Sequence, residues 1–186
     1  MNQPAKVVSA PSEAAALLAQ CAEAVAAARG LFAAARAGLA AKLSSGGKIS
    51  NKALENDQFA AHALAWTATY VESLIQLAHW AEGLRATGAL GETERLILAI
   101  GFGEYLSQLR GGIPMSQGEI ARPREAGLSE ADVEAFLVPA VRALIEGGNT
   151  DAARARLVEL MIEQDGAATF GATGLGAFSA ISVDPA

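Results

Sequence analysis

The sequence has few of the residues on which most protein chemistry depends. Its 186 residues include one cysteine, two histidines and only 5% aromatic residues. The single Cys21 excludes a disulfide framework within the chain, and its alanine-rich helical setting predicts a buried, small apolar thiol. His62 and His79 are seventeen residues apart on one predicted helix. That separation is about 25 Å at 1.5 Å per residue, so the two cannot share a metal within one chain.

Basic charge and targeting signals are scarce as well. Lys and Arg number 14 against 20 Asp and Glu, a net charge of −6, which argues against nucleic acid or an anionic membrane as the main partner. The N-terminus lacks the charged region and apolar run of a signal peptide, and we find no uncharged apolar stretch of about 18 residues. The sequence therefore predicts a soluble, cytoplasmic protein.

What the sequence does contain is alanine, which supplies nearly half of its 52% hydrophobic residues. Alanine is the best helix former and buries little area, so the composition favours closely packed helices over a sheet. The length suits one domain. We predict an all-α fold: an antiparallel helical bundle of four long helices plus a short fifth. A flexible leader (1–11) precedes the helical domain (12–165), and a disordered or loosely packed tail (166–186) follows it.

Apolar residues recur every three or four positions along the predicted helices, which is the spacing of a buried stripe. We expect helices over about 12–43, 51–86, 92–110, 129–146 with a kink at Pro139, and 151–164, where Met161 should face inward. Ser12 should cap the first of these helices, Gly88 should end the second, and Ser129 with Asp132 should form a capping box on the fourth. Gly101 and Gly103 should mark a crossing of the third helix with another helix. The first stripe comprises Leu18, Cys21, Val25, Ala28, Phe32, Ala35 and Leu39, and the second Phe59, Ala63, Trp66, Tyr70, Leu74, Leu77, Trp80 or Ala81, and Leu84. The rings on the second helix could line a ligand pocket, but their helical spacing favours core packing.

The stretch Tyr105–Leu128 differs from the rest because glycine and proline interrupt it while polar residues remain frequent. We interpret it as an ordered Gly/Pro loop that fixes how the flanking helix pairs face each other. Glu119 and Arg122 could form an ion pair within it. A flexible linker would not need these polar side chains. We therefore expect the loop to be ordered and the rest of the fold to be organised around it.

No motif in the chain supplies a catalytic or metal site. The GFG at 101–103 lies inside a predicted helix with no preceding strand, so it is not a dinucleotide fingerprint, and no Walker loop or serine elbow is present. Several carboxylates gather near the loop, and solvated helix faces or caps explain them better than general acid or base roles. These carboxylates are Glu92, Glu94, Glu104, Glu119 and Glu125.

Two blocks nevertheless resemble a known family. AWTATYVESLIQLAHWAEGL and ILAIGFGEYLSQLRGGIPMSQGEIARP are similar to the N-terminal helical extension of acyl-CoA dehydrogenases of the methylsuccinyl-CoA type, and the similarity runs from about Asn51 through ARARLVELM. In such enzymes the extension precedes a fold that holds FAD and an acyl-CoA thioester. The resemblance implies that the complete enzyme oxidises methylsuccinyl-CoA to mesaconyl-CoA and passes electrons through FAD to an electron-transferring flavoprotein.

The resemblance also implies what this chain does not carry. After about Gly174 the sequence departs from the family, and no residue corresponds to the catalytic glutamate, the FAD contacts or the CoA cradle, which indicates a truncated or frame-shifted product. Gln108, Gly111 and Gly112 resemble a Gln-x-x-Gly-Gly element that approaches the FAD of a neighbouring subunit in acyl-CoA dehydrogenases. Ile113, Pro114 and Met115 replace the residues that usually follow, and a helix-ending turn explains the same glycines.

Two hypotheses about function therefore remain. The first is a non-catalytic module that binds no cofactor or metal alone and docks on an acyl-CoA dehydrogenase catalytic domain or a like subunit, without nucleic acid or membrane and with a possible homo-oligomer. The second is a free-standing, alanine-rich helical protein for interaction or surface coating. The second predicts self-association through an exposed apolar face.

Overall fold

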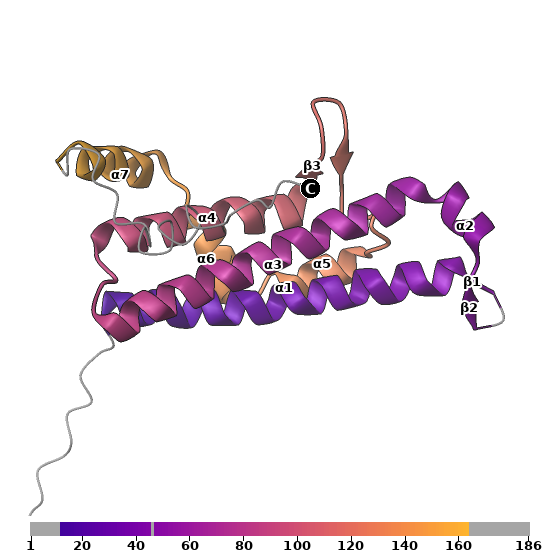
Figure 1. The fold of residues 1–186 in the computed structure, drawn as a ribbon, viewed down its shortest axis with the longest axis horizontal. Coiled ribbons are helices and arrows are strands. Elements are labelled where there is room, and N and C mark those ends of the chain that lie inside the picture. Colours follow the sequence, from indigo (N-terminus) through magenta and orange to yellow (C-terminus); the bar gives the residue numbers. More distant parts are fainter. Residues whose placement is uncertain (1–11, 46, 164–186) are drawn as a thin grey trace, which may run out of the picture.

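The bundle is built from helices of very different lengths. The computed structural model describes residues 12–45 and 47–163, so the predicted leader and tail lie outside the described residues. Within them, seven α-helices and two small antiparallel hairpins follow one another along the chain (Figure 1). The helices are α1 (Glu13–Leu43), α2 (Asn51–Asn56), α3 (Gln58–Thr87), α4 (Glu92–Gly111), α5 (Glu130–Phe136), α6 (Pro139–Gly147) and α7 (Asp151–Glu163); the hairpins pair β1 (Ser44–Ser45) with β2 (Lys48–Ile49) and β3 (Ile113–Pro114) with β4 (Ile120–Ala121). The predicted all-α fold is confirmed.

Helix α1 runs the length of the bundle and contacts α3, α4, α5 and α6. As predicted, the Ser12 hydroxyl caps it by accepting a hydrogen bond from the amide of Ala15 at 3.3 Å. Its buried stripe differs from the prediction at two positions: Ala24 and Leu31 are buried, whereas Val25 and Phe32 are only partly buried. Small side chains at the contact let several helices approach α1 at once.

Helix α1 is long and apolar enough, by length and composition alone, to cross a membrane, which differs from our expectation that no stretch would pass that test. In the bundle, however, its leucines Leu18, Leu31, Leu39 and Leu43 are buried against the other helices. The core helix of a bundle passes the same test, so we treat α1 as a core element.

The predicted second helix is divided at Asp57 into α2 and α3. The backbone of Asp57 leaves the helical region, with φ −118° and ψ 32°, and its amide donates to the carbonyls of Ala53 and Leu54. Its carboxylate accepts from Nζ of Lys42 at 2.5 Å. This ion pair ties the break to the last turn of α1, beside the β1–β2 hairpin that joins the two helices.

The large rings of α3 lie beside the core rather than inside it, contrary to our prediction. Phe59 is 41% exposed, and Trp66, Tyr70 and Trp80 are only partly buried. The face that α3 buries is made of smaller residues: Ala63, Thr67, Val71, Leu74, Ile75 and Ala81. The narrow gap between α3 and the alanine-rich α1 suits these side chains and leaves no room for an indole ring.

Helix α4 crosses the end of α6 through two glycines. A Cβ atom added to Gly103 would lie 2.7 Å from the amide nitrogen of Asn149 and 2.8 Å from the carbonyl oxygen of Leu144. One added to Gly148 would overlap the carbonyl oxygen of Ala99 on α4. The sequence predicted a helix crossing at Gly101–Gly103, and the structure places that crossing against the α6–α7 turn.

The predicted fourth long helix is two short ones. Ser129 and Asp132 form the predicted capping box of α5, with Ser129 N to Asp132 Oδ2 at 2.8 Å and Asp132 N to Ser129 Oγ at 3.2 Å. Pro139 is the first residue of α6 instead of a kink within one helix, because a first-turn proline loses no helical hydrogen bond there. The break lets α5 and α6 follow the curved surface of α1 and α4.

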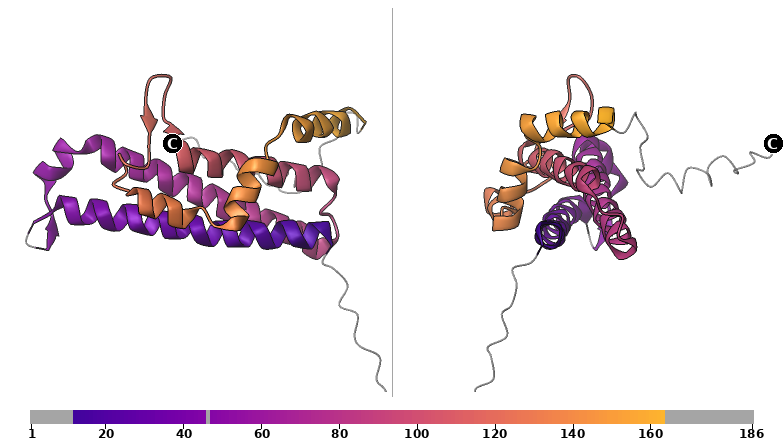
Figure 2. Two further views of the ribbon diagram at one scale, coloured as in Figure 1. Left: turned by 180° about the vertical axis from the view of Figure 1, so that it is seen from behind. Right: turned by 90° about the vertical axis from the view of Figure 1, so that its left-hand side faces the viewer.

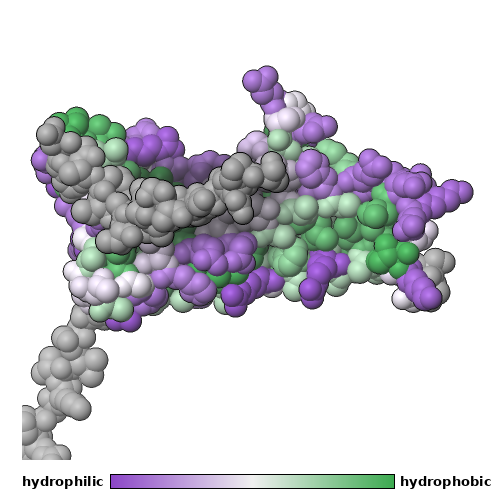
Figure 3. Space-filling view, viewed as in Figure 1, coloured by the Kyte–Doolittle hydropathy of each residue, from purple (hydrophilic) through white to green (hydrophobic). Residues whose placement is uncertain are grey.

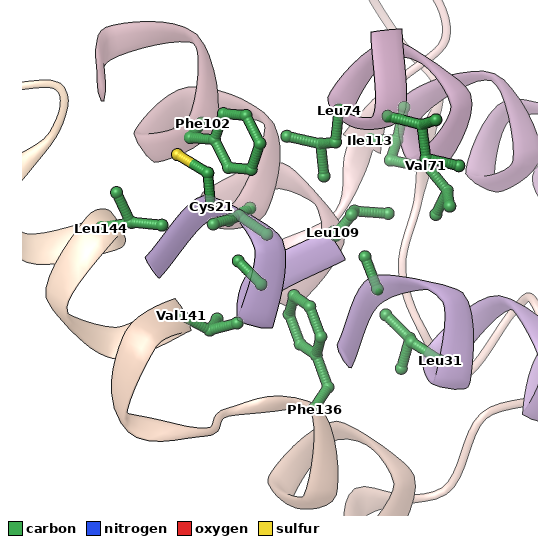
Figure 4. Packing of buried hydrophobic residues seen from close by; sticks show 14 of the residues in the cluster. Cys21, Leu31, Val71, Leu74, Phe102, Leu109, Ile113, Phe136, Val141 and Leu144 are labelled. Carbon is green, nitrogen blue, oxygen red and sulfur yellow. The ribbon is translucent and has the colours of Figure 1, made fainter. Parts of the chain in front are cut away.

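The core lies where α1, α3, α4 and the α5–α6 pair meet (Figure 4). Phe102 of α4 and Phe136 of α5 are its largest fully buried side chains, and Cys21 of α1 belongs to the same buried cluster. The predicted burial of Cys21 is confirmed, since its exposure is 0%. Burial also raises the pKa of Cys21 to about 12, so its thiol is protonated at neutral pH.

Candidate docking surface

The Gly/Pro segment is embedded at its base and exposed at its tip. Ile113 pairs with Ala121 in the β3–β4 ladder, and both are buried, as are Ala126 and Leu128. Strand β3 contacts α3 and α4, so the base of the segment packs against these two helices. The rest of the hairpin, including exposed Ile120, projects away from the bundle (Figures 1 and 2).

The ion pair within this segment involves a different carboxylate from the one predicted. Arg122 lies 3.6 Å from Glu125, not next to Glu119, and its amide donates to Oε2 of Glu125 at 2.6 Å. Glu125 also lies 3.7 Å from the guanidinium of Arg124. Residues 122–126 form a helical turn, which brings positions three apart together, whereas Glu119 belongs to the projecting hairpin.

A chain of polar side chains connects α3, α4 and the α6–α7 turn. The Tyr70 hydroxyl donates to Oε1 of Gln108 at 2.5 Å, and the Gln108 amide donates to Oε1 of Glu104 at 2.5 Å. The other Glu104 oxygen accepts from Nδ2 of Asn149 at 2.5 Å, and Asn149 accepts from Arg154 at 2.7 Å. The network therefore fixes three elements relative to one another, and α7 begins where it ends.

Aromatic rings accompany this network along α3. Tyr70 lies against Tyr105 with ring centroids 4.7 Å apart, and the Trp66 indole donates to His62 at 2.9 Å. Burial, and next the neighbouring Tyr105 and Glu104, raise the pKa of Tyr70 above its ordinary value, so this hydroxyl keeps its proton and acts as a donor. The rings form a half-buried ridge, a surface typical of protein contacts.

The candidate cofactor residues have contacts within the chain. Gln108 uses both ends of its amide in the network just described. Gly112 ends α4 with φ +137°, and a Cβ there would lie 2.6 Å from Cγ2 of Ile120. Gly111 is exposed, with open space where a Cβ would stand. These contacts are those of a helix end leading into a hairpin.

The carboxylates near the loop have separate partners. Glu94 caps α4 by accepting from the amide of Gly91 at 2.9 Å, and Glu104 belongs to the polar network. Glu92 accepts from Nε of Arg156 at 2.9 Å, and that hydrogen bond lowers the pKa of Glu92 below its ordinary value. Among the described residues no group of three or more His, Cys, Asp or Glu side chains is placed to hold a metal ion.

A shallow groove of about 390 Å³ lies between the helical turn at 122–126 and α5. It is lined by both signs of charge, from Arg122 and Arg124 on one side to Glu130 and Glu134 on the other. Because the charges oppose each other across an open surface, the groove favours no single class of charged ligand.

Large apolar side chains are exposed at three places in the described part of the chain. One group lies at the α2 end of the bundle, where Figure 3 shows apolar surface, and another lies on α7 at the opposite end. The third is Ile120 in the projecting hairpin. The two groups are Ile49, Leu54 and Phe59, which we call the end patch, and Val158, Met161 and Ile162, which we call the α7 strip. We predicted that Met161 faces inward, and this was wrong.

The comparisons with known proteins bear on what such surfaces could contact. No family model matches the sequence. Over 145 residues the chain is 57% identical to (2S)-methylsuccinyl-CoA dehydrogenase of Cereibacter sphaeroides. The chain matches one segment of that enzyme. The match covers 78% of this chain but 26% of the dehydrogenase, so the chain spans about a quarter of the relative's length. The predicted resemblance is confirmed.

Sequence reasoning missed the α7 strip as a surface feature. The signal was present, because Val158 and Ile162 are four residues apart on one side of the helix, while Leu160 is on the other side. The prediction for α7 assigned all of its apolar residues to one inner face, although they lie on two sides of the helix. The exposed side is visible only once the position of α4 relative to α7 is known.

Proposed function

We propose that this chain acts as the non-catalytic helical module of a FAD-dependent acyl-CoA dehydrogenase of the methylsuccinyl-CoA type. The observation that carries the proposal is the 57% identity to one such enzyme over only about a quarter of its length. In this proposal the remaining part supplies FAD and converts methylsuccinyl-CoA to mesaconyl-CoA. This chain contributes rigid helices and an exposed contact surface, in the cytoplasm, to a catalytic domain or a like subunit.

The arrangement of the described residues favours a structural role for this chain over a catalytic one. Gln108 is held by Tyr70 and Glu104, Glu94 caps α4, and Glu92 pairs with Arg156. Buried or half-buried polar groups with complete hydrogen bonding stabilise a unique packing. The chain's own residues thus hold α3, α4 and α7 in fixed relation, and the surfaces they present would dock on the catalytic part.

We propose a structural role for Gln108, Gly111 and Gly112, and Gln108→Leu tests it. The substitution leaves the Tyr70 hydroxyl and one Glu104 oxygen without their partner, so the free energy of unfolding should fall by about 1–2 kcal/mol. Gln76→Leu is the matched control, because Gln76 is exposed and bonds only to Glu72 one turn away; its effect should stay within about 0.5 kcal/mol. Urea titrations measure both. A fall in the flavin content of the assembled enzyme with unchanged stability would instead assign Gln108 to the cofactor.

The proposed function is tested by reassembly. The tagged chain is co-expressed with the Cereibacter sphaeroides dehydrogenase from which the matching segment has been removed. We expect the two to purify together in a fixed ratio, with flavin absorbance near 450 nm that depends on the dehydrogenase part. The chain expressed alone should have no such band.

Two results would contradict the proposal. A stoichiometric flavin band in the chain purified alone would show that it holds a cofactor by itself. Failure to purify together, combined with concentration-dependent self-association of the chain, would favour the free-standing interaction or coating protein. Light scattering over a range of chain concentrations distinguishes that outcome from a simple monomer.

A further inference from the structure

Helix α7 is apolar on two opposite sides, and only one of them is covered. Leu160 is 7% exposed on the inner side, where α7 contacts α4. Two residues further on, about 200° around the helix axis, Ile162 is 74% exposed, and Val158 is 54% exposed one turn before it. The outer side therefore has the character of an interface in a larger assembly.

The position of α7 is fixed from its inner side. Arg156 donates through Nε and Nη2 to both oxygens of Glu92 at the start of α4, at 2.9 and 3.1 Å, and its Nη1 lies 3.3 Å from both Glu159 and Glu163. At the helix start, Asn149 joins α7 to the polar network through Glu104 and Arg154. The α7 strip is thus presented on a helix held at two points, which lowers the ordering cost of binding.

We infer that the α7 strip is the surface that docks on the dehydrogenase part, an inference that rests on the proposed function. The relative's length beyond the match is about three times the matched length, which is enough to cover one short helix. Glu159 and Glu163, each next in sequence to a strip residue, lie along one edge of the strip and share Arg156 as their ion-pair partner. The partner surface should accordingly be apolar with Lys or Arg at its edge.

The end patch is the natural competitor, and it provides the matched control. It also exposes three apolar side chains, but they come from β2, α2 and the first turn of α3 beside the chain reversal at the far end of the bundle. The helix that carries Phe59 has its small-residue face buried against α1. The end patch therefore lacks the continuous helical strip of α7.

The test measures binding of full-length chain variants to the Cereibacter sphaeroides dehydrogenase lacking the matching segment. Val158→Gln with Ile162→Gln should raise Kd at least tenfold, because it replaces the exposed apolar centre of the strip with polar, helix-compatible side chains. Leu54→Gln with Phe59→Gln should change Kd less than twofold. Both double variants alter exposed positions, and circular dichroism and urea titration verify that each remains folded. Raising NaCl should weaken wild-type binding several-fold through the acidic edge.

The outcomes distinguish failure of the proposed function from failure of the docking inference alone. If the wild-type chain neither binds nor rescues the soluble expression of the dehydrogenase part, the proposed function is overturned and the docking inference with it. If wild type binds and the α7 double variant binds equally well, or the end-patch variant is the one that loses binding, only the docking inference is overturned. A wild-type dimer that the α7 substitutions convert to a monomer would assign the strip to a second copy of the chain and also overturn it.

Discussion

Alanine at Gly148 or at Gly103 is expected to lower the free energy of unfolding by about 3 kcal/mol, although each substitution adds one methyl group. At Gly148 the new Cβ would overlap the carbonyl oxygen of Ala99 and lie 2.6 Å from that of Leu144; at Gly103 it would lie 2.7 Å from the amide nitrogen of Asn149. All of these neighbours are backbone atoms. Helix α4 and the α6–α7 turn must therefore move apart, which a rotamer change cannot avoid.

Gly83→Ala is the control for this prediction. Gly83 lies inside α3, and a Cβ there would meet no atom within 4 Å. Because glycine costs a helix interior about 0.5–1 kcal/mol relative to alanine, this substitution should stabilise the protein by that amount. Urea titrations with a common m value measure all three variants. Equal effects at Gly83 and Gly148 would contradict the close crossing of α4 and α6.

The crossing also determines the direction of α7. Gly148 and Asn149 form the turn from which α7 starts, and Asn149 bonds to Glu104 on α4. Separating the helices at this point would shift the α7 strip relative to the rest of the bundle. A folded Gly148 variant should consequently lose affinity for the dehydrogenase part even though it keeps every side chain of the strip.

The helix ends were predictable because local chemistry determines them. Ser12 caps α1, Ser129 and Asp132 cap α5, and Gly88 ends α3 in the left-handed conformation with φ +74°, all as the sequence indicated. Each of these signals acts within four residues. The breaks at Asp57 and Pro139 were harder, since each depends on a partner helix: Lys42 on α1 for the first, and the surface of α1 and α4 for the second.

The rotation of each helix was less predictable than its bounds. The rings of Trp66 and Tyr70 have more apolar area to bury than Ala63 and Thr67, yet the smaller residues are the ones buried. The deciding factor is the distance between α1 and α3, which is set by alanines on the partner and invisible in either stripe alone. The same limitation applies to the α7 strip, because exposure is a property of what surrounds a helix.

In the candidate site, too, local features could be predicted from the sequence, whereas contacts between distant residues could not. The turn at Gly111–Gly112 could be inferred from glycine spacing, while the bond from Tyr70 to Gln108 joins residues 38 positions apart and the bond from Asn149 to Glu104 joins residues 45 apart. No spacing rule reports such pairs. They become visible only when α3, α4 and the α6–α7 turn are placed side by side.

Phe102→Ala should be among the most destabilising single substitutions, lowering the free energy of unfolding by about 3–5 kcal/mol. Phe102 is fully buried at the meeting point of α1, α4 and α6, and truncation leaves a cavity that the surrounding helices cannot close without losing their own contacts (Figure 4). Phe59→Ala is the matched control. Its ring is already 41% exposed, so its loss should cost below about 1 kcal/mol.

Cys21 reports this loss without an added probe, because it is the only cysteine and it is buried in the same core cluster as Phe102. In the folded protein the thiol is inaccessible and, with a pKa of about 12, protonated at pH 8, so a thiol reagent reaches it only after opening. When opening and closing are fast relative to labelling, the labelling rate follows the open population, and a loss of 3–5 kcal/mol should accelerate it about 100-fold or more. Phe59→Ala should leave the rate within about fivefold of wild type. Fast labelling of the wild-type protein under native conditions would contradict the packing of α1 against α4 on which the whole bundle depends.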